Sequence, residues 1–257
     1  PGQILNWDNS RGEFKHPIFW ASIFTKSYKR EFSISDEELA LVSVKNHKQA
    51  KENPNALSNK TYTIQDVMNS KKLTDDLKLL DCSQPCTGSA SIILATEEIT
   101  RKITDNPVWI TGIGQKTTSA GFTKNETFSS MESTKLSGQD ALKMSNHTIH
   151  DIDVAEVHDA FSVCEPMALE SLGFSGYGKG MNMINDLYET NDFKINPRGG
   201  LIGSGHPLGA TGISQTIEIA QQIQSNSNKR QVDNANVGLV HNMSAAATSS
   251  TVLVLEK

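Results

Sequence analysis

The sequence predicts an α/β protein in which helices are layered against a sheet. From about residue 107 onward, short apolar runs of strand length alternate with longer segments of helical periodicity. Such alternation favours helices packed on a sheet. The 257 residues can bury a substantial core, and a content of 37% hydrophobic and 21% charged residues is typical of a globular protein.

The composition excludes several classes of protein. The net charge of −5 provides no basic footprint for nucleic acid, and no apolar run reaches the roughly 18 residues of a membrane span. Three cysteines, an odd and sparse number, argue against a disulfide framework and indicate a reducing, cytoplasmic environment. Cys82 and Cys86 lack the second pair or nearby histidine that a metal site needs, so we interpret both as buried structural thiols and expect no metal.

The first part of the chain reads as an irregular, partly helical region. Ser35 and Glu38 have the spacing of a capping box at the start of a helix that Asn53-Pro54 would end. A turn-rich patch then separates two mostly apolar runs, which we expect to be strands. The expected helices cover residues 17–29, 35–51 and 63–70, and the expected strands cover 77–80 and 89–95.

The rest of the chain carries the regular alternation. The expected strands cover residues 108–113, 152–157, 237–241 and 251–255, and the expected helices cover 138–144, 159–172 and 207–224. Asp159 can cap the helix that begins beside it, and Pro207 suits the first position of the following one.

Three histidines fall at strand ends or helix starts, the edge where ligands bind in open α/β sheets. Four glycines in the run 199–205 precede His206, and they permit unusual backbone conformations and the close approach of a ligand. Each histidine also has a structural explanation. Local backbone groups could satisfy His158, a glycine-rich turn could hold His206 as a bystander, and the small residues after His241 also suit a close-packed turn.

Several motifs together resemble one family. Residues 205–212 (GHPLGATG), with 196–203 before them, are similar to the C-terminal signature of thiolases. Residues 157–161 (VHDAF) resemble the His-Asp-x-Phe motif of the sterol-carrier-protein-2-like and archaeal thiolase branch. Residues 81–95 resemble the loop and strand that close the family's N-terminal domain, and 44–47 resemble its loop region. The likeness runs nearly end to end.

The resemblance implies a thiolase fold with layers in the order αβαβα, of which this chain lacks most of the N-terminal half. It divides the chain into a loop or insert region (1–75), the closing strands and helix of the N-terminal thiolase domain (76–104) and the C-terminal thiolase domain (105–257). The implied reaction is the reversible Claisen condensation or thiolysis of acyl-CoA, such as acetyl-CoA. The coenzyme A thioester is then the substrate, and no separate cofactor is implied.

The resemblance also implies roles for single residues. His206 matches the histidine that activates the nucleophilic cysteine, because a thiolate attacks and a thiol does not. His158 matches a histidine that helps to hold the thioester oxygen, often through a water, as the oxygen gains enolate charge. The other candidate residues for binding substrate or coenzyme A are Ser204, Gly205, His241, Asn242 and Phe161.

The sequence departs from the family at both catalytic cysteines. The nucleophile belongs to the family's N-terminal third, and none of the three cysteines here matches it. The second cysteine stands third in the His-Asp-x-Phe motif of some relatives and begins a Cys-x-Gly-Gly loop in others. This chain has Ala160 and Asn242 at those two places.

These departures leave two main interpretations. The protein is either a thiolase-type acyltransferase whose nucleophile lies on an N-terminal segment or subunit absent here, or a CoA-thioester-binding protein without thiolase activity. The second class includes a retro-aldolase-like enzyme and a non-catalytic partner subunit, and a lipid-carrying module is a third reading. We expect a homo-oligomer or a complex with the N-terminal thiolase half. Without that half, the chain is expected to expose a large apolar patch and to be insoluble or unstable.

Overall fold

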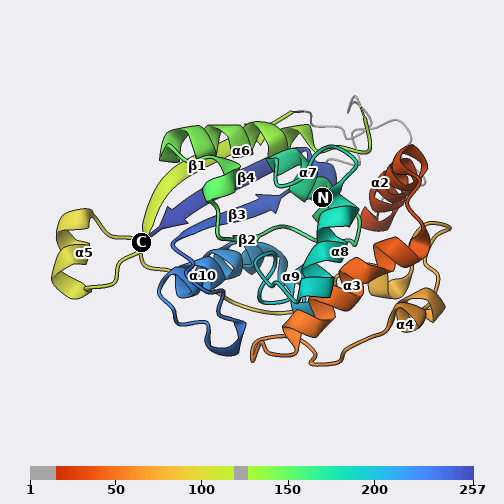
Figure 1. Cartoon of the computed structure of the whole chain (residues 1–257), viewed down its shortest axis with the longest axis horizontal. Coiled ribbons are helices and arrows are strands. Elements are labelled where there is room, and N and C mark those ends of the chain that lie inside the picture. Colours follow the sequence, from red (N-terminus) through yellow and green to blue (C-terminus); the bar gives the residue numbers. More distant parts are fainter. Residues whose placement is uncertain (1–15, 119–126) are drawn as a thin grey trace.

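The computed structural model describes residues 16–118 and 127–257 of the chain. A four-stranded sheet has helices on both faces, and a further helical region packs at one end of it (Figure 1). The strand order is β1-β4-β3-β2, with β4 antiparallel to both of its neighbours and β2 parallel to β3. The strands are β1 (Trp109–Thr117), β2 (Val154–Glu156), β3 (Val237–Met243) and β4 (Ser249–Glu256).

The helices form two groups along the chain. The helices before the sheet are α2 (Pro17–Phe32), α3 (Asp36–Ala50), α4 (Ile64–Asn69) and α5 (Glu97–Ile103). The helices of the sheet-bearing part are α6 (Glu132–Ser145), α7 (Cys164–Leu172), α8 (Gly180–Thr190), α9 (Gly200–Ser204) and α10 (Thr211–Ile223). Short 3₁₀ turns lie between them, including η1 (Leu79–Asp81) and η4 (Leu208–Ala210).

Glycines in the strands set how closely the helices approach the sheet. A Cβ atom on Gly114 of β1 would lie 1.9 Å from the carbonyl oxygen of Ser137 in α6. A Cβ atom on Gly238 of β3 would lie 2.4 Å from Cγ2 of Ile219 in α10. Helix α6 therefore packs on one face of the sheet and α10 on the other (Figure 1).

Alternate strand residues divide the core between these two faces. Val252 and Val254 belong to the larger apolar cluster, which includes residues of α6 and α7. Val240 and Leu255 belong to a smaller cluster with Ile219 of α10. This division follows the two-residue period of a strand, and it confirms the predicted α/β class.

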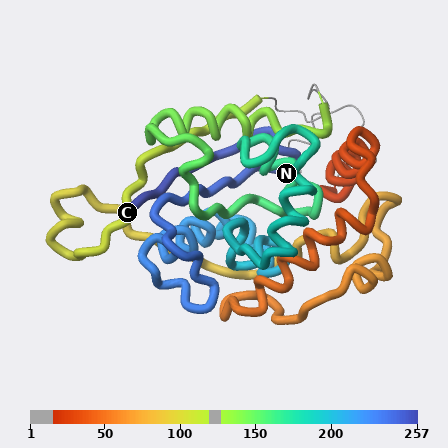
Figure 2. The backbone as a smooth tube through the Cα atoms, viewed as in Figure 1, coloured from red at the N-terminus to blue at the C-terminus, as the bar shows by residue number. Residues whose placement is uncertain are grey.

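Helix α3 connects the N-terminal region to the rest of the fold. The predicted capping box is present, with the Glu38 carboxylate accepting from the Ser35 backbone at 2.7 Å. Eleven of the fifteen residues of α3 are buried, so polar side chains face the interior as well as apolar ones. In Figure 2 the α3 segment runs beside the α8 and α9 segments, which are far from it in sequence.

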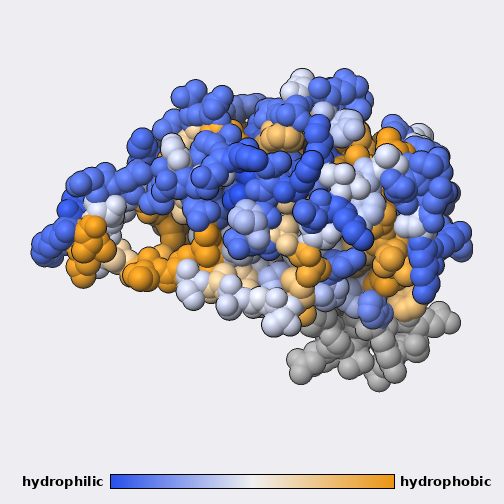
Figure 3. All heavy atoms as spheres, turned by 90° about the horizontal axis from the view of Figure 1, so that it is seen from below, coloured by the Kyte–Doolittle hydropathy of each residue, from blue (hydrophilic) through white to orange (hydrophobic). Residues whose placement is uncertain are grey.

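Residues 89–106 form an arm that extends from the body around α5 (Figure 1). The predicted strand over 89–95 is wrong, because these residues have no hydrogen-bonded neighbour strand in the described chain. Ile93 is 93% exposed and Leu94 is 72% exposed. Figure 3 shows apolar side chains gathered on this arm, with a gap between it and the body.

One other predicted strand and two predicted helix starts are also wrong. The run 77–80 ends in the 3₁₀ turn η1 instead of a strand. Helix α7 begins at Cys164, not at residue 159, because Phe161 forms a bridge with Cys82 before the helix starts. Helix α10 begins at Thr211, since the turn η4 separates it from Pro207. The other predicted helices and strands are present, with ends shifted by a few residues.

Within the described residues, no helix combines the length and the apolar character needed to cross a bilayer.

The close packing of α6 on β1 predicts a large effect of one methyl group. Gly114→Ala should lower the free energy of unfolding by about 3 kcal/mol, because the new Cβ atom collides with the backbone of α6. Gly209→Ala is the matched control, because a Cβ atom there has open space around it and the change should stay within about 0.5 kcal/mol. Urea unfolding of both variants measures the difference, and equal stabilities would contradict this packing.

Candidate active site

A cavity of about 700 Å³ brings together residues from distant parts of the chain. Its lining comes from the start of α2, from segment 79–85, and from the residues that follow β2 and end β3. Most of the lining is apolar and includes Trp20, Phe161 and Met243. His158 and His206 both line it, with ring centroids 5.1 Å apart and ring planes perpendicular.

His158 follows strand β2 and is held by Asn242 at the end of β3. The side-chain amide of Asn242 donates to Nδ1 of His158 at 3.0 Å and to Oε1 of Gln215 at 2.8 Å. An acceptor role for Nδ1 assigns the proton of the neutral ring to Nε2. His158 is therefore arranged as a neutral hydrogen-bond donor.

His206 lies in the loop between α9 and η4. Its Nδ1 is 2.7 Å from Oγ1 of Thr211, the first residue of α10. Its backbone N–H donates to the carbonyl of Gln84 at 2.8 Å, and its carbonyl accepts from the N–H of Cys86 at 3.3 Å. These bonds fix the ring through Nδ1 and leave Nε2 for a ligand.

Both imidazoles are electrically neutral near pH 7. Burial lowers the pKa of His206 to about 4, and the nearby Arg198 guanidinium adds to the effect. Burial also lowers the pKa of His158 well below its usual value, with further contributions from His206, His241 and Arg198. A neutral imidazole can accept a proton or donate a hydrogen bond, which are the two functions of an acid–base pair.

Comparison with known proteins identifies the family. The family model described as Thiolase C-terminal domain-like matches residues 114–257, which is more than half of the chain. The chain belongs to the thiolase family. An acetyl-CoA acetyltransferase of Methanothermobacter thermautotrophicus is 35% identical over 253 residues, which cover 98% of this chain and 66% of the relative. Human sterol carrier protein 2 is 35% identical over 225 residues, covering 85% of this chain and 41% of that protein.

Solved structures confirm the thiolase fold. An Ltp2–ChsH2 aldolase matches with a TM-score of 0.82 and 23% identity, over 95% of this chain and 64% of that one. The acetyl-CoA acetyltransferase of Bacillus anthracis matches with a TM-score of 0.68 and 15% identity, over 92% of this chain and 59% of that one. The thiolase chain thus spans between about two fifths and two thirds of the length of these proteins.

The predicted site residues of the thiolase chain separate into two groups. Phe161 and Asn242 line the cavity with the two catalytic candidates. Ser204 and Gly205 precede His206 but do not line the cavity, and the Ser204 hydroxyl hydrogen-bonds to the carbonyl of Arg198. His241 is fully buried behind His158, where its Nδ1 accepts from the His158 backbone N–H at 3.4 Å. The structure therefore does not bring His241 to the cavity.

The glycine-rich run before His206 accommodates protein atoms instead of a ligand. A Cβ atom on Gly200 would lie 2.2 Å from Oδ2 of Asp159, and one on Gly203 would lie 2.4 Å from the carbonyl oxygen of Asn46 in α3. The expectation that these two glycines admit a ligand is therefore wrong. They allow α9 to rest directly on Asp159 and α3.

Asp159 also differs from its predicted role. Its carboxylate accepts from the backbone N–H groups of Leu201 at 2.6 Å and Ile202 at 3.3 Å, so it caps α9 and not the adjacent α7. The sequence pattern did not reveal this role, because a residue that caps a helix usually lies directly before it in the chain. Asn196 was also missed, although it belongs to the quoted motif, and its Oδ1 accepts from the Val157 N–H at 2.8 Å.

None of the three thiols forms a hydrogen bond with His158 or His206. Cys82 lines the cavity, but its Sγ contacts the carbonyl of Lys78, and burial raises the pKa of this thiol to about 12. Cys164 is buried in α7, where burial raises its pKa as well. Cys82 and Cys86 are half-buried, so their predicted full burial is wrong.

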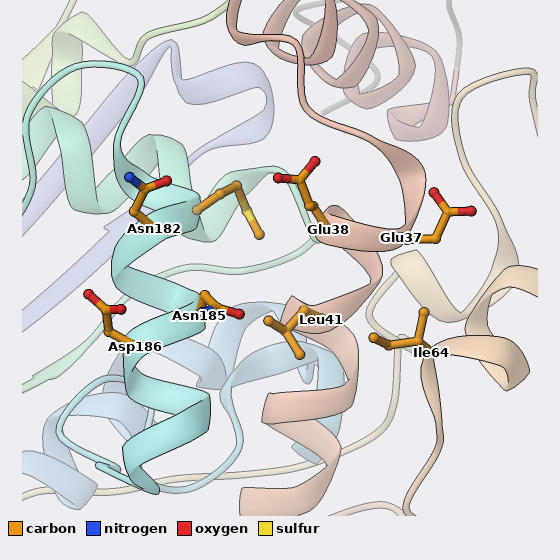
Figure 4. A pocket seen from close by; sticks show the side chains of 8 residues that line it. Glu37, Glu38, Leu41, Ile64, Asn182, Asn185 and Asp186 are labelled. Carbon is orange, nitrogen blue, oxygen red and sulfur yellow. The ribbon is translucent and has the colours of Figure 1, made fainter.

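A second hollow, of about 530 Å³, lies between α3, α4 and α8 (Figure 4). It is lined by Glu37, Glu38, Leu41, Ile64, Met181, Asn182, Asn185 and Asp186. Its three carboxylates would repel the phosphates of coenzyme A. The Glu38 carboxylate is already engaged in the capping box of α3. The cavity with the histidines is therefore the better candidate for the site.

The burial of His241 predicts a pH-dependent difference in stability. Burial lowers the pKa of His241 to about 3, so the unfolded chain takes up a proton below pH 6.5 that the folded chain excludes. The stability advantage of the native protein over His241→Gln should therefore shrink by about 3 kcal/mol between pH 7 and pH 4. Urea unfolding across this range measures it, with the exposed His150→Gln as control for the loss of one imidazole. A difference that is independent of pH would exclude a buried neutral His241.

Proposed function

We propose that this chain is the histidine-bearing half of a thiolase-type acyltransferase that condenses or cleaves acyl-CoA thioesters. The observation that carries the proposal is the perpendicular pair of neutral imidazoles, His158 and His206, 5.1 Å apart at an apolar cavity. The relatives named as acetyl-CoA acetyltransferases support this reaction class. The nucleophilic cysteine would come from an N-terminal thiolase segment, either on the same polypeptide or on a partner subunit.

The geometry supports distinct roles for the two imidazoles. His206 would accept the proton of the incoming thiol, and the resulting thiolate would raise the pKa of the imidazole beside it and stabilise the ion pair. In the condensation direction the thiolate would then attack the thioester carbonyl carbon, and coenzyme A would leave with the proton held by His206. In the cleavage direction it would attack the β-keto carbon, and the enolate of the shorter acyl-CoA would leave and be protonated. His158, with its proton on Nε2, would donate to the oxygen on which negative charge develops.

The apolar lining supports these roles. The acyl chain would occupy the side of the cavity formed by Trp20, Phe161 and Met243, while the thioester lies at the imidazoles. Because this environment excludes water, a hydrogen bond to the developing oxyanion is worth more than it would be in solvent.

A second candidate function is a thiolase-fold protein that binds CoA thioesters without thiolase chemistry. It is favoured by Ala160, which has no proton to exchange, and by the absence of a hydrogen bond between any thiol of this chain and either histidine. A retro-aldolase-like enzyme would need only the donor and the base, not the cysteine pair. A non-catalytic partner subunit would need neither.

Thiolysis of acetoacetyl-CoA by free coenzyme A tests the main proposal in the complete protein. His206→Ala and His158→Ala should each lower kcat/KM at least about 100-fold, because each removes a proton acceptor or donor from the reacting atoms. His147→Ala is the matched control, because its ring pairs with Glu256 on the surface. Unchanged thiolysis by both cavity variants would exclude this mechanism. Retro-aldol cleavage of a β-hydroxyacyl-CoA without thiolysis would favour the second candidate.

We further propose that the exposed arm is the contact for the N-terminal thiolase segment. Isolated strands are unstable without a hydrogen-bonded neighbour, and residues 89–95 have the apolar character of a strand but no partner strand among residues 16–118 and 127–257. Apolar side chains of α5 extend the same surface, with Ile99 51% and Ile103 70% exposed. A partner that pairs with this segment would cover both.

Hydrogen exchange tests this contact. In the complete protein the amides of residues 89–95 should exchange slowly, and they should exchange faster in Ile93→Asp. Ile93→Asp should weaken the association at least about tenfold, because it places a charge in an apolar contact. Met144→Asp, on an exposed side of α6, should leave the association unchanged. Rapid exchange at 89–95 in the assembled protein would disprove the contact.

A further inference from the structure

A buried polar cluster joins α3 to the two loops that carry the histidines. Lys45 and Glu165 form an ion pair, with Nζ 2.8 Å from Oε1, and both side chains are at most 2% exposed. The angles at this contact are not those of a hydrogen bond. The amide of Asn46 donates to Oδ2 of Asp159 at 2.7 Å and to Oε2 of Glu165 at 2.6 Å. The amide of Asn196 donates to the same Glu165 oxygen at 3.0 Å.

The cluster holds the chain on both sides of His158. Asn196 accepts from the N–H of Val157, the residue before His158, and Asp159 is the residue after it. The other oxygen of Asp159 accepts from the N–H of Leu201 at the start of α9. Because α9 ends one residue before Gly205-His206, the same carboxylate also positions the second histidine.

The cluster balances charge as well as hydrogen bonds. Two buried carboxylates, on Asp159 and Glu165, share the one amide of Asn46, and the ammonium of Lys45 pairs with Glu165. Burial and the neighbouring Glu165 raise the pKa of Asp159 well above its usual value, whereas the hydrogen bonds to its carboxylate all come from donors and favour the ionised form. Loss of the ammonium would favour protonation of a carboxyl, because two buried like charges cannot both remain ionised. A protonated Asp159 would be a weaker acceptor for α9.

We propose that Lys45 and Asn46 are positioning residues of the active site, which act through Glu165 and Asp159 to fix His158 and His206 relative to each other. That Lys45 and Asn46 matter for catalysis rests on the proposed function. Their effect on the positions of His158 and His206 does not. Neither residue lines the cavity, so neither touches the substrate. Their effect would reach the reaction only through the two imidazoles.

A second buried ion pair supplies the matched control. Arg230 and Glu218 lie 2.8 Å apart with side chains 8% and 5% exposed, and they connect α10 to the turn after it and to the carbonyl of Glu52, with no hydrogen bond to His158 or His206. Loss of the charge in either pair leaves a buried carboxylate without its partner, which should destabilise the fold. Of these two pairs, only the one at Lys45 is bonded to the segments around His158 and His206. The buried pair Glu156–Arg198 also joins these segments, and all the variants leave it intact.

The test uses the complete protein, with [¹⁵N]histidine in this chain and no acyl-CoA present. Lys45→Met and Asn46→Ala should each shift the imidazole ¹⁵N resonances of His158 and His206. Lys45→Met/Glu165→Gln should bring them back toward the native positions, because the unpaired charge is removed while an acceptor remains for both amides. Arg230→Met should lower the urea midpoint without moving these two resonances.

Each possible outcome either supports or contradicts the positioning role of Lys45 and Asn46. Shifts in both cavity histidines that the double substitution reverses support the positioning role. Lower stability with unmoved histidine resonances in Lys45→Met and Asn46→Ala would overturn it, as would equal shifts in Arg230→Met. If Lys45→Met does not fold, Asn46→Ala and the double substitution still test the positioning role. Asn46→Ala keeps the Lys45–Glu165 ion pair, and the double substitution removes both of its charges. Since no turnover is measured, failure of the thiolase proposal would leave this result unaffected.

Discussion

The fold around the site depends on one buried carboxylate. Asp159 lies directly after His158, and it accepts the first free N–H groups of α9, which leads to His206. A helix start has unpaired donors, and the two that bond to Asp159 offset part of the cost of burying its carboxylate. The glycines of α9 let the helix approach this carboxylate and α3 closely. One carboxylate therefore joins the segments that carry both imidazoles.

Burial and chemistry are consistent at this site. The apolar cavity keeps His158 and His206 neutral, and the amide of Asn242 determines which nitrogen of His158 carries the proton. A neutral donor and a neutral acceptor side by side suit a reaction in which charge appears only as the thioester reacts. The described chain contains this pair, but none of its thiols hydrogen-bonds to either imidazole, which is why we assign the nucleophile to the N-terminal thiolase segment.

The sequence revealed what depends on local pattern. The helices of the N-terminal region, the four strands of the sheet and the family motif around His206 could all be predicted, because periodicity and capping residues are local. The strand expected at 89–95 was wrong because a strand also requires a neighbour. The roles of Asp159, Asn46 and His241 could not be predicted, since each acts on a segment at least 40 residues away or is hidden behind another side chain.

In the proposed enzyme, this chain supplies the base and the oxyanion donor, and another segment supplies the nucleophile. The most direct measurement is to incubate the complete protein with acetyl-CoA, trap the covalent intermediate with acid and map the acetyl group by peptide mass spectrometry. We expect an acetyl thioester on a cysteine outside these 257 residues, and its loss in His206→Ala. An acetyl group on Cys82, Cys86 or Cys164 would contradict it.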